Sequence, residues 1–342
     1  MRNARPATLV VERVLHHGRV SGYHRLAEYL VDRGAARVAA HRFPRHGTWR
    51  LAQPFVRRGG VRWYGPDAWM TEVWAALTTW RGRILHFLYG ESAYRYAAAV
   101  PGHRRLVATF HLPPSVFGDY VGVTRHLERL AAIIFVAGNQ LEILDRLRSR
   151  PSAYVVAHGI DVEYFIPTPR PTSSMDCLFV GQWLRDLTTL EGVVRTVQRA
   201  APATRFRLVL PPGAADRWRG RSGVDLLMGV DDATLRSCYQ DAALLVMPLR
   251  DCTANNALLE AMACGLPIVA TDVGGMRDYT DDSCAILTSP GRVDQMSEAV
   301  LSLLGDDARR QAMGKAARVR AETFAWPRIA DRMAAIYREL AE

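Results

Sequence analysis

Short apolar runs alternate with helical patterns along the whole chain, and this alternation constrains the fold more than any other feature. It is typical of βαβ units, in which helices connect parallel strands. In the first half, the predicted strands are 8–15, 37–41, 84–88, 106–110, 133–136 and 153–156. The helices predicted between them are 23–32, 67–80, 92–99, 120–130 and 140–148. The first half is therefore expected to form one parallel α/β unit.

A Pro-rich segment, 165–174, interrupts the pattern, and its three prolines without apolar periodicity predict a linker. The predicted strands that follow it are 176–180, 205–210, 243–247 and 267–270. The predicted helices are 186–199, 233–240, 257–263, 293–304, 308–322 and 326–340. We therefore expect an α/β fold with two Rossmann-like domains, 1–165 and 166–325, facing across a cleft. Ligands of such sheets bind beyond the carboxyl ends of the strands.

The positive charge of the chain is confined to its first half. Residues 1–165 carry 23 Arg and 12 Asp or Glu, a net charge of +11, whereas residues 166–342 carry 21 basic and 22 acidic residues. A basic surface favours anionic partners, such as a lipid headgroup layer or an acidic acceptor. Alternatively, the charge reflects only the composition of the chain. Lys315 is the only lysine beside 43 arginines, and this bias indicates a GC-rich genome. Since the arginines are scattered, no nucleic acid partner is expected.

The cysteines and the apolar runs bear on the compartment. All five cysteines lie in the second half without a C-x-x-C spacing, which indicates reduced thiols. No apolar run reaches the roughly 18 residues of a membrane helix, and the N-terminus lacks the pattern of a signal peptide. We expect a cytoplasmic protein, with peripheral contact to an anionic membrane at its inner face as a further expectation.

The stretch 253–275, TANNALLEAMACGLPIVATDVGG, carries the most specific chemistry. Asn255 and Asn256 suit a helix N-terminus, where short polar side chains accept hydrogen bonds from free backbone N–H groups. Gly265 suits the end of the helix. Glu260 is the one charge in this apolar helix, and a buried carboxylate needs a partner. It either serves the helix dipole or a salt bridge, or it points into a cleft and accepts hydrogen bonds from sugar hydroxyls.

Three motifs of the first half supply further candidates. The loop 16–24 follows the first strand, where Gly18 and Gly22 permit tight turns and Ser21 suits a helix cap. His111 stands at the tip of the strand 106–110, and the two prolines 113 and 114 are expected to keep the next residues extended. Glu91 ends the motif HFLYGE, where it either binds acceptor hydroxyls or caps the next helix.

The stretch 253–275 and the turn FVGQWLRD, 179–186, resemble the signatures of retaining glycosyltransferases of family 4, the glycosyl transferases group 1, which have the GT-B fold. The resemblance implies an N-terminal acceptor domain, a C-terminal donor domain and a last helix, 326–342, that crosses back to the first domain. It implies that Glu260 holds the donor ribose, that Arg185 neutralises the diphosphate and that His111 lies near the transferred sugar. The implied donor-binding residues also include Gly18, Gly181, Asn255, Asn256 and Ala257. The implied acceptor-side residues are Ser21, Gly22 and Glu91.

The chain departs from the family pattern at the donor site. Gln182 stands where the family has Arg, and Cys252 stands where it has the first of two glutamates. Asp251, or Asn255 and Asn256, are expected to replace that glutamate. No D-x-D motif ends a strand, so neither a metal nor another cofactor is expected.

The expected activity is transfer of a sugar from a nucleotide-diphosphate donor to a hydroxyl of a glycan, a glycolipid or a small molecule, with retention of configuration. The alternatives are a GT-B sugar-nucleotide epimerase or phosphorylase, and a non-catalytic nucleotide-sugar-binding partner protein.

Overall fold

The computed structural model describes residues 6–11, 20–39, 62–79, 82–102, 105–122, 124–168 and 175–342. The chain divides into two compact units. Unit 1 is built from residues before position 18, from Gly22–His158 and from Trp326–Glu342, and unit 2 from the short segment 18–21 and Gly159–Ala325. The division follows His158 and so precedes the Pro-rich segment, of which 169–174 lie outside the described residues.

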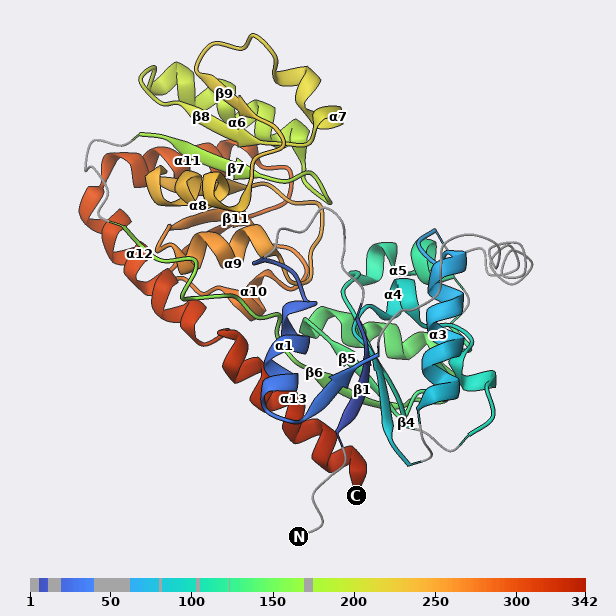
Figure 1. Cartoon of the computed structure of the whole chain (residues 1–342). Helices are drawn as coiled ribbons and strands as arrows, with labels where there is room; N and C mark the ends of the chain where they lie inside the picture. The colour runs from blue at the N-terminus through green and yellow to red at the C-terminus, as the bar shows by residue number, and fades with distance from the viewer. Residues whose placement is uncertain are drawn as a thin grey trace. The chain divides into compact units, whose positions relative to one another are not determined.

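Unit 1 contains a six-stranded parallel sheet in the order β2-β1-β3-β4-β5-β6 (Figure 1). Its strands are β1 Ala7–Val10, β2 Ala36–Val38, β3 Ile84–Phe87, β4 Arg105–Phe110, β5 Ala132–Phe135 and β6 Ser152–Val155. Its helices are α1 Arg25–Asp32, α3 Pro66–Thr78, α4 Gly90–Ala93, α5 Pro114–Val121 and α13 Trp326–Ala341, with 3-10 turns η1 Ala97–Ala99, η2 Leu127–Arg129 and η3 Gly138–Arg146. The last helix, α13, packs against α1, where the Arg33 guanidinium donates to Asp331 at 2.6 Å.

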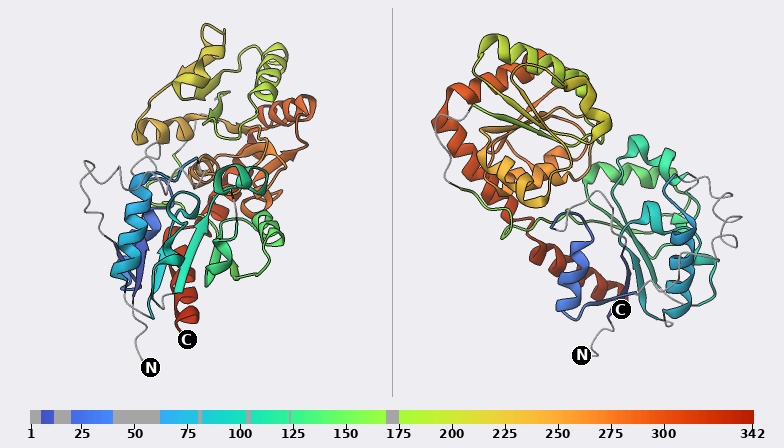
Figure 2. Two further views of the ribbon diagram at one scale, coloured as in Figure 1. Left: turned by 90° about the vertical axis from the view of Figure 1, so that its right-hand side faces the viewer. Right: turned by 45° about the horizontal axis from the view of Figure 1, so that its top comes forward.

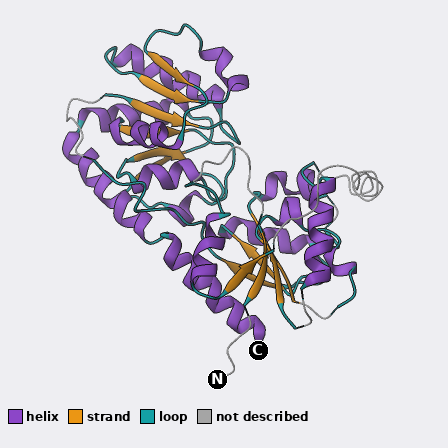
Figure 3. Ribbon diagram, in the orientation of Figure 1, coloured by secondary structure: helices purple, strands orange, loops and turns teal. Residues whose placement is uncertain are grey.

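Unit 2 contains a second six-stranded parallel sheet, in the order β12-β11-β10-β7-β8-β9 (Figure 2). Its strands are β7 Cys177–Val180, β8 Phe206–Val209, β9 Val224–Leu227, β10 Leu244–Met247, β11 Ile268–Thr271 and β12 Ala285–Thr288. Its helices are α6 Leu187–Ala200, α7 Pro212–Ala215, α8 Asp232–Asp241, α9 Asn256–Ala263, α10 Met276–Tyr279, α11 Val293–Gly305 and α12 Asp307–Glu322, with the 3-10 turn η4 Asp216–Trp218. Helices flank each sheet (Figure 3), and the two sheets confirm the predicted α/β fold class.

Several sequence predictions of local structure were wrong. The residues after Pro113 and Pro114 were expected to be extended, but they form helix α5. A helix was expected at 120–130, but α5 begins at Pro114, because proline fits the first turn of a helix, where its missing N–H costs nothing. Ser21 does not cap α1, whose N-cap is His24. The strands β9 and β12 were not anticipated. Within the described ranges, no helix combines the length and the apolarity that crossing a bilayer requires.

Close glycine packing seats α9, the helix of the 253–275 stretch, against α12. The Cβ of an alanine at position 314 would lie 2.3 Å from the carbonyl oxygen of Gly265. Gly265 itself has a φ of 70°, the left-handed conformation that favours glycine at a helix end. The missing side chain at 314 therefore allows the backbone of α12 to touch the end of α9.

We predict that Gly314→Ala destabilises the fold by about 1–3 kcal/mol, because the added methyl must push α12 away from backbone atoms. The matched control is Gly305→Ala, also in a helix, where the added Cβ would meet no atom within 4 Å. The control is expected to be neutral or slightly stabilising. Urea unfolding measures both, and equal unfolding free energies for the two variants would contradict the packing argument.

Candidate functional site

The N-terminus of α9 follows β10 in unit 2, at the edge where the parallel strands end. Asn255 is its N-cap, and its side-chain oxygen accepts the Leu258 backbone N–H at 3.3 Å. The sequence prediction of this helix start is confirmed. Asn256 and Ala257 form the first turn of the helix, where backbone N–H groups lack helical partners. Such a terminus favours an anion.

Arg185 brings a buried positive charge to this helix start. Arg185 is 8% exposed. Its guanidinium donates hydrogen bonds to the carbonyl oxygens of Val180 at 3.1 Å and Trp183 at 3.2 Å. A third hydrogen bond goes to Asn255 Oδ1 at 3.2 Å. Among the described residues, no carboxylate forms an ion pair with it. Burial lowers the pKa of Arg185 to about 10, so the side chain stays charged at neutral pH. The site thus holds a buried cation whose charge the neighbouring groups do not neutralise.

The turn 181–186 forces Arg185 into this position. Gly181 has a φ of 86°, and an added Cβ there would lie 3.4 Å from Arg185 Nη2. Leu184 has a φ of 53°, a conformation that costs energy for a residue with a side chain. Asp186 then caps α6 by accepting the N–H groups of Thr188 and Thr189. Near the end of this strained turn, the Arg185 guanidinium donates a hydrogen bond to Asn255.

Glu260 is 3% exposed and engaged on both carboxylate oxygens. Tyr239 of α8 donates its hydroxyl to Oε2 at 2.8 Å, and Ser21 donates its hydroxyl to Oε1. Ser21 belongs to the segment 18–21, which the structure groups with unit 2. Glu260 was expected either to serve the helix dipole or a salt bridge, or to accept hydrogen bonds from sugar hydroxyls. The structure gives it two protein hydroxyls.

Burial raises the pKa of Glu260 to about 7, although the hydrogen bonds from Ser21 and Tyr239 oppose the shift. The pKa of the Tyr239 hydroxyl is raised as well, chiefly by burial and then by the charge of Glu260. Tyr239 was not among the predicted site residues. It lies among polar residues in the segment 233–240, so the sequence does not single it out as the partner of Glu260.

Cys252, at the position of the expected glutamate, is buried in the loop after β10. Its thiol donates to the Val273 carbonyl at 3.3 Å, and burial raises its pKa to about 12, so it is a neutral thiol at physiological pH. Its backbone carbonyl accepts the Gly275 N–H at 3.0 Å. A Cβ at Gly274 would lie 2.0 Å from that carbonyl and 2.6 Å from Asp251 Oδ1. Cys252 therefore ties two loops together and places Asp251 at the same edge.

Unit 1 gathers a second group of predicted residues. His111 follows β4, and its Nδ1 lies 3.1 Å from Glu91 Oε1. The rings of Tyr23 and Tyr89 each lie 4.7 Å from the His111 ring, measured between centroids. Neither tyrosine was predicted. Gly22 has a φ of 103° and its carbonyl accepts the Arg25 N–H at the start of α1.

The predicted residues thus fall into two groups. Ser21, Arg185, Asn255 and Glu260 meet in unit 2, where Gly181 shapes the turn, and Glu91 and His111 meet in unit 1. Gly18 lies outside the described residues. In the part of the chain that the structure describes, no three His, Cys, Asp or Glu side chains are grouped so that they could hold a metal ion.

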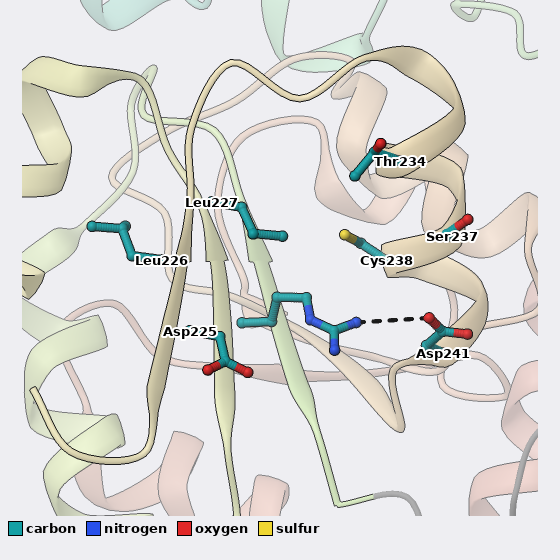
Figure 4. A pocket seen from close by; sticks show the side chains of 8 residues that line it. Asp225, Leu226, Leu227, Thr234, Ser237, Cys238 and Asp241 are labelled. Atoms are coloured by element: carbon teal, nitrogen blue, oxygen red, sulfur yellow. Dashed lines mark ion pairs between the residues drawn. The ribbon is translucent and has the colours of Figure 1, made fainter.

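An open hollow of about 480 Å³ lies elsewhere in unit 2, between the sheet and α8 (Figure 4). Arg207 and Asp241 face each other across it at 3.9 Å. Its other lining residues are Asp225, Leu226, Leu227, Thr234, Ser237 and Cys238. None of the predicted site residues lines this hollow.

Residues 175–306 match the family model "Glycosyl transferases group 1". The chain is 29% identical over 217 residues to a D-inositol 3-phosphate glycosyltransferase of Kribbella flavida, an alignment that covers 55% of this chain and 51% of the relative. The chain thus spans about half the length of that relative.

Solved structures share the fold. Sucrose-phosphate synthase from Thermosynechococcus elongatus aligns with a TM-score of 0.71 at 18% identity, over 98% of this chain and 99% of that one. HepE from Anabaena, in a structure with UDP-glucose, aligns with a TM-score of 0.68 at 13% identity, over 97% and 99%. The two parallel sheets and these neighbours show the GT-B fold, and residues 175–306 carry the match to the glycosyl transferases group 1.

Proposed function

We propose that the protein transfers a sugar from a nucleotide-diphosphate donor to an acceptor hydroxyl with retention of configuration. Unit 2 holds the donor in this proposal, and unit 1 holds the acceptor. The observation that carries it is the buried Arg185 charge at the N-terminus of α9, without a carboxylate partner among the described residues. Leaving a buried charge uncompensated is costly, so this arrangement favours an anionic ligand.

A diphosphate fits the chemistry of this place. The guanidinium and the free N–H groups of the first turn of α9 donate hydrogen bonds, and the leaving diphosphate develops negative charge as the sugar departs. Stabilising that charge lowers the barrier of the transfer without a metal. The acceptor hydroxyl attacks the anomeric carbon from the face that the phosphate leaves, and the leaving phosphate accepts its proton. Retention then needs no carboxylate nucleophile on the opposite face of the sugar.

Glu260 recognises the ribose in this proposal. Its two oxygens already accept the hydroxyls of Ser21 and Tyr239, so they are oriented for hydroxyl donors. A ribose hydroxyl takes the place of the Ser21 hydroxyl on Oε1, while Tyr239 continues to hold Oε2. The exchange replaces one hydroxyl hydrogen bond with another and leaves no buried oxygen unpaired.

The sugar end of the donor is read differently from the family pattern. The neutral Cys252 thiol is a weak acceptor, so Asp251 or the two asparagines at the start of α9 take over the hydrogen bonds to sugar hydroxyls. His111 of unit 1 orients sugar hydroxyls. The Anabaena neighbour was solved with UDP-glucose, and this supports a nucleotide sugar as the donor class. Contact with an anionic membrane stays a prediction.

The direct experiment incubates the full chain with UDP-, GDP- and dTDP-sugars and a panel of glycan, glycolipid and small-molecule acceptors. The proposal expects nucleoside diphosphate release coupled to a product with the donor's anomeric configuration, read by NMR. Epimerised donor without any acceptor would favour the epimerase. Nucleotide-sugar binding without turnover over the whole panel would favour the non-catalytic partner protein.

We predict that Arg185→Ala lowers kcat/KM by about 100-fold or more, because the charge on the leaving group loses its buried cation. Arg185→Lys should fall between this variant and the wild type, since lysine keeps the charge and loses the planar fork. The control is Arg277→Ala in the same unit, whose exposed side chain pairs with Asp272. Rates for Arg185→Ala equal to those of the control, at unchanged melting temperature, would remove Arg185 from the site.

The raised pKa of Glu260 predicts a pH dependence of nucleotide binding. Hydroxyl donors favour the ionised carboxylate, which predominates only above about pH 7. Below that pH, binding must first remove a proton, so affinity falls by up to about tenfold per pH unit. Calorimetry of nucleoside diphosphate binding at pH 6 and 8 measures the effect. The control is Glu260→Gln, which lacks this carboxyl but binds the same titrating phosphate of the nucleotide. The same pH dependence in the wild type and in this variant would contradict the role of Glu260 in nucleotide binding.

A chelator tests the expected metal independence. Because Arg185 and α9 supply the positive charge at the diphosphate, we predict that excess EDTA leaves the transfer rate within about twofold. The measurement compares initial rates with EDTA, without it, and with Mg²⁺ or Mn²⁺ added back. A loss on chelation that either metal restores would show that the charge compensation is incomplete without a cation.

A further inference from the structure

The order of strands in unit 1 brings two polar side chains together that are 20 positions apart in the sequence. β3 and β4 are parallel neighbours, and Phe87 pairs with Ala108. α4 follows β3 and carries Glu91, while His111 directly follows β4. Both residues therefore stand beyond the carboxyl ends of adjacent strands, where Glu91 Oε1 lies 3.1 Å from His111 Nδ1.

The carboxylate of Glu91 is buried, and the whole residue is 5% exposed. Its Oε2 is shielded from solvent and has no hydrogen-bond partner among the described residues. Glu91 is not the N-cap of α4, because Tyr89 holds that position and Glu91 lies inside the helix. A buried carboxylate needs a partner, and the structure gives it the His111 ring.

Gly90 makes this contact sterically allowed. A Cβ at position 90 would lie 2.7 Å from the Phe110 ring, closer than real contacts permit. Phe110 is the last residue of β4 and directly precedes His111. The glycine therefore lets α4 close onto the end of β4, and the next residue of α4 reaches the histidine.

Two tyrosines fix the plane of the histidine ring. The rings of Tyr23 and Tyr89 lie 4.7 Å from it at interplanar angles of 71° and 32°. The Tyr89 hydroxyl in turn accepts the Tyr23 backbone N–H at 3.0 Å. A ring packed against two aromatic rings and held by a carboxylate at one nitrogen has little freedom to rotate.

We propose that Glu91 is a positioning residue for His111: its carboxylate accepts a hydrogen bond from Nδ1–H, and so fixes which ring nitrogen carries the proton and where the ring points. The hydrogen bonds that neighbouring groups make to a histidine ring decide which of its two nitrogens carries the proton. Glu91 then acts through His111 and does not itself bind acceptor hydroxyls. The functional part of this inference rests on the proposed function, and the structural part does not.

Ring-nitrogen NMR on ¹⁵N-histidine-labelled full chain tests the structural part without any substrate. At pH 8, we expect the His111 signals of an Nδ1–H ring. Glu91→Ala should shift them toward the Nε2–H form, and Glu91→Gln should preserve Nδ1–H, since its amide oxygen still accepts. His111→Asn assigns the signals. An Nε2–H ring in the wild type, or unchanged signals in Glu91→Ala, would overturn the proposal.

Kinetics test the functional part with a matched control. Glu91→Ala is expected to lower kcat on the order of 10- to 100-fold with a smaller change in the donor KM, because a misplaced group costs rate before affinity. Glu91→Gln should recover most of kcat. Asp119→Ala removes an exposed carboxylate from the same unit and should leave both constants unchanged. Melting temperatures exclude unfolding as the cause.

The outcomes separate the two claims. A wild-type protein without transferase activity would remove the proposed function and leave the NMR result to decide on Glu91. An active enzyme in which Glu91→Gln is as slow as Glu91→Ala at equal melting temperature would overturn the positioning role, because the charge and not the geometry would then matter.

Discussion

Unit 2 depends on the hydrogen bonds of two buried ionisable groups, Arg185 at the start of α9 and Glu260 within that helix. Neither is neutralised by the other, because Arg185 binds carbonyls and Asn255, while Glu260 accepts hydroxyls from Ser21 and Tyr239. Buried polar groups of this kind cost stability unless each hydrogen bond is made. The strained turn at Leu184 precedes Arg185 and brings its guanidinium to these carbonyls, and the proposed ligand relieves the remaining charge.

In both units, glycines let neighbouring loops and helices approach one another closely. In unit 2, the bare backbone of Gly274 lets the loop after β11 lie on the Cys252 carbonyl, and Gly314 lets α12 touch the end of α9. In unit 1, Gly90 lets α4 reach Phe110, which brings Glu91 to His111. Parallel sheets place successive loops along one edge. The absence of side chains at these positions sets how closely the loops approach one another.

The sequence predicted the buried strands because their apolar runs are continuous, as in Cys177–Val180 and Leu244–Met247. It did not predict β9, whose Asp225 interrupts a short run at the edge of the sheet, or α5, whose first residue is a proline. The helix start at Asn255 was predictable from local capping chemistry. The partners of Glu260 were not, since Ser21 lies 239 positions away and only the folded chain brings them together.

The position of a bound nucleotide tests the proposed site most directly, and crystals soaked separately with UDP, GDP and dTDP measure it. The account predicts that a bound diphosphate lies at the N-terminus of α9 within hydrogen-bond distance of Arg185. A ribose hydroxyl should occupy Glu260 Oε1 in place of Ser21. A nucleotide bound elsewhere in unit 2, with the Ser21 to Glu260 hydrogen bond intact, would contradict the account.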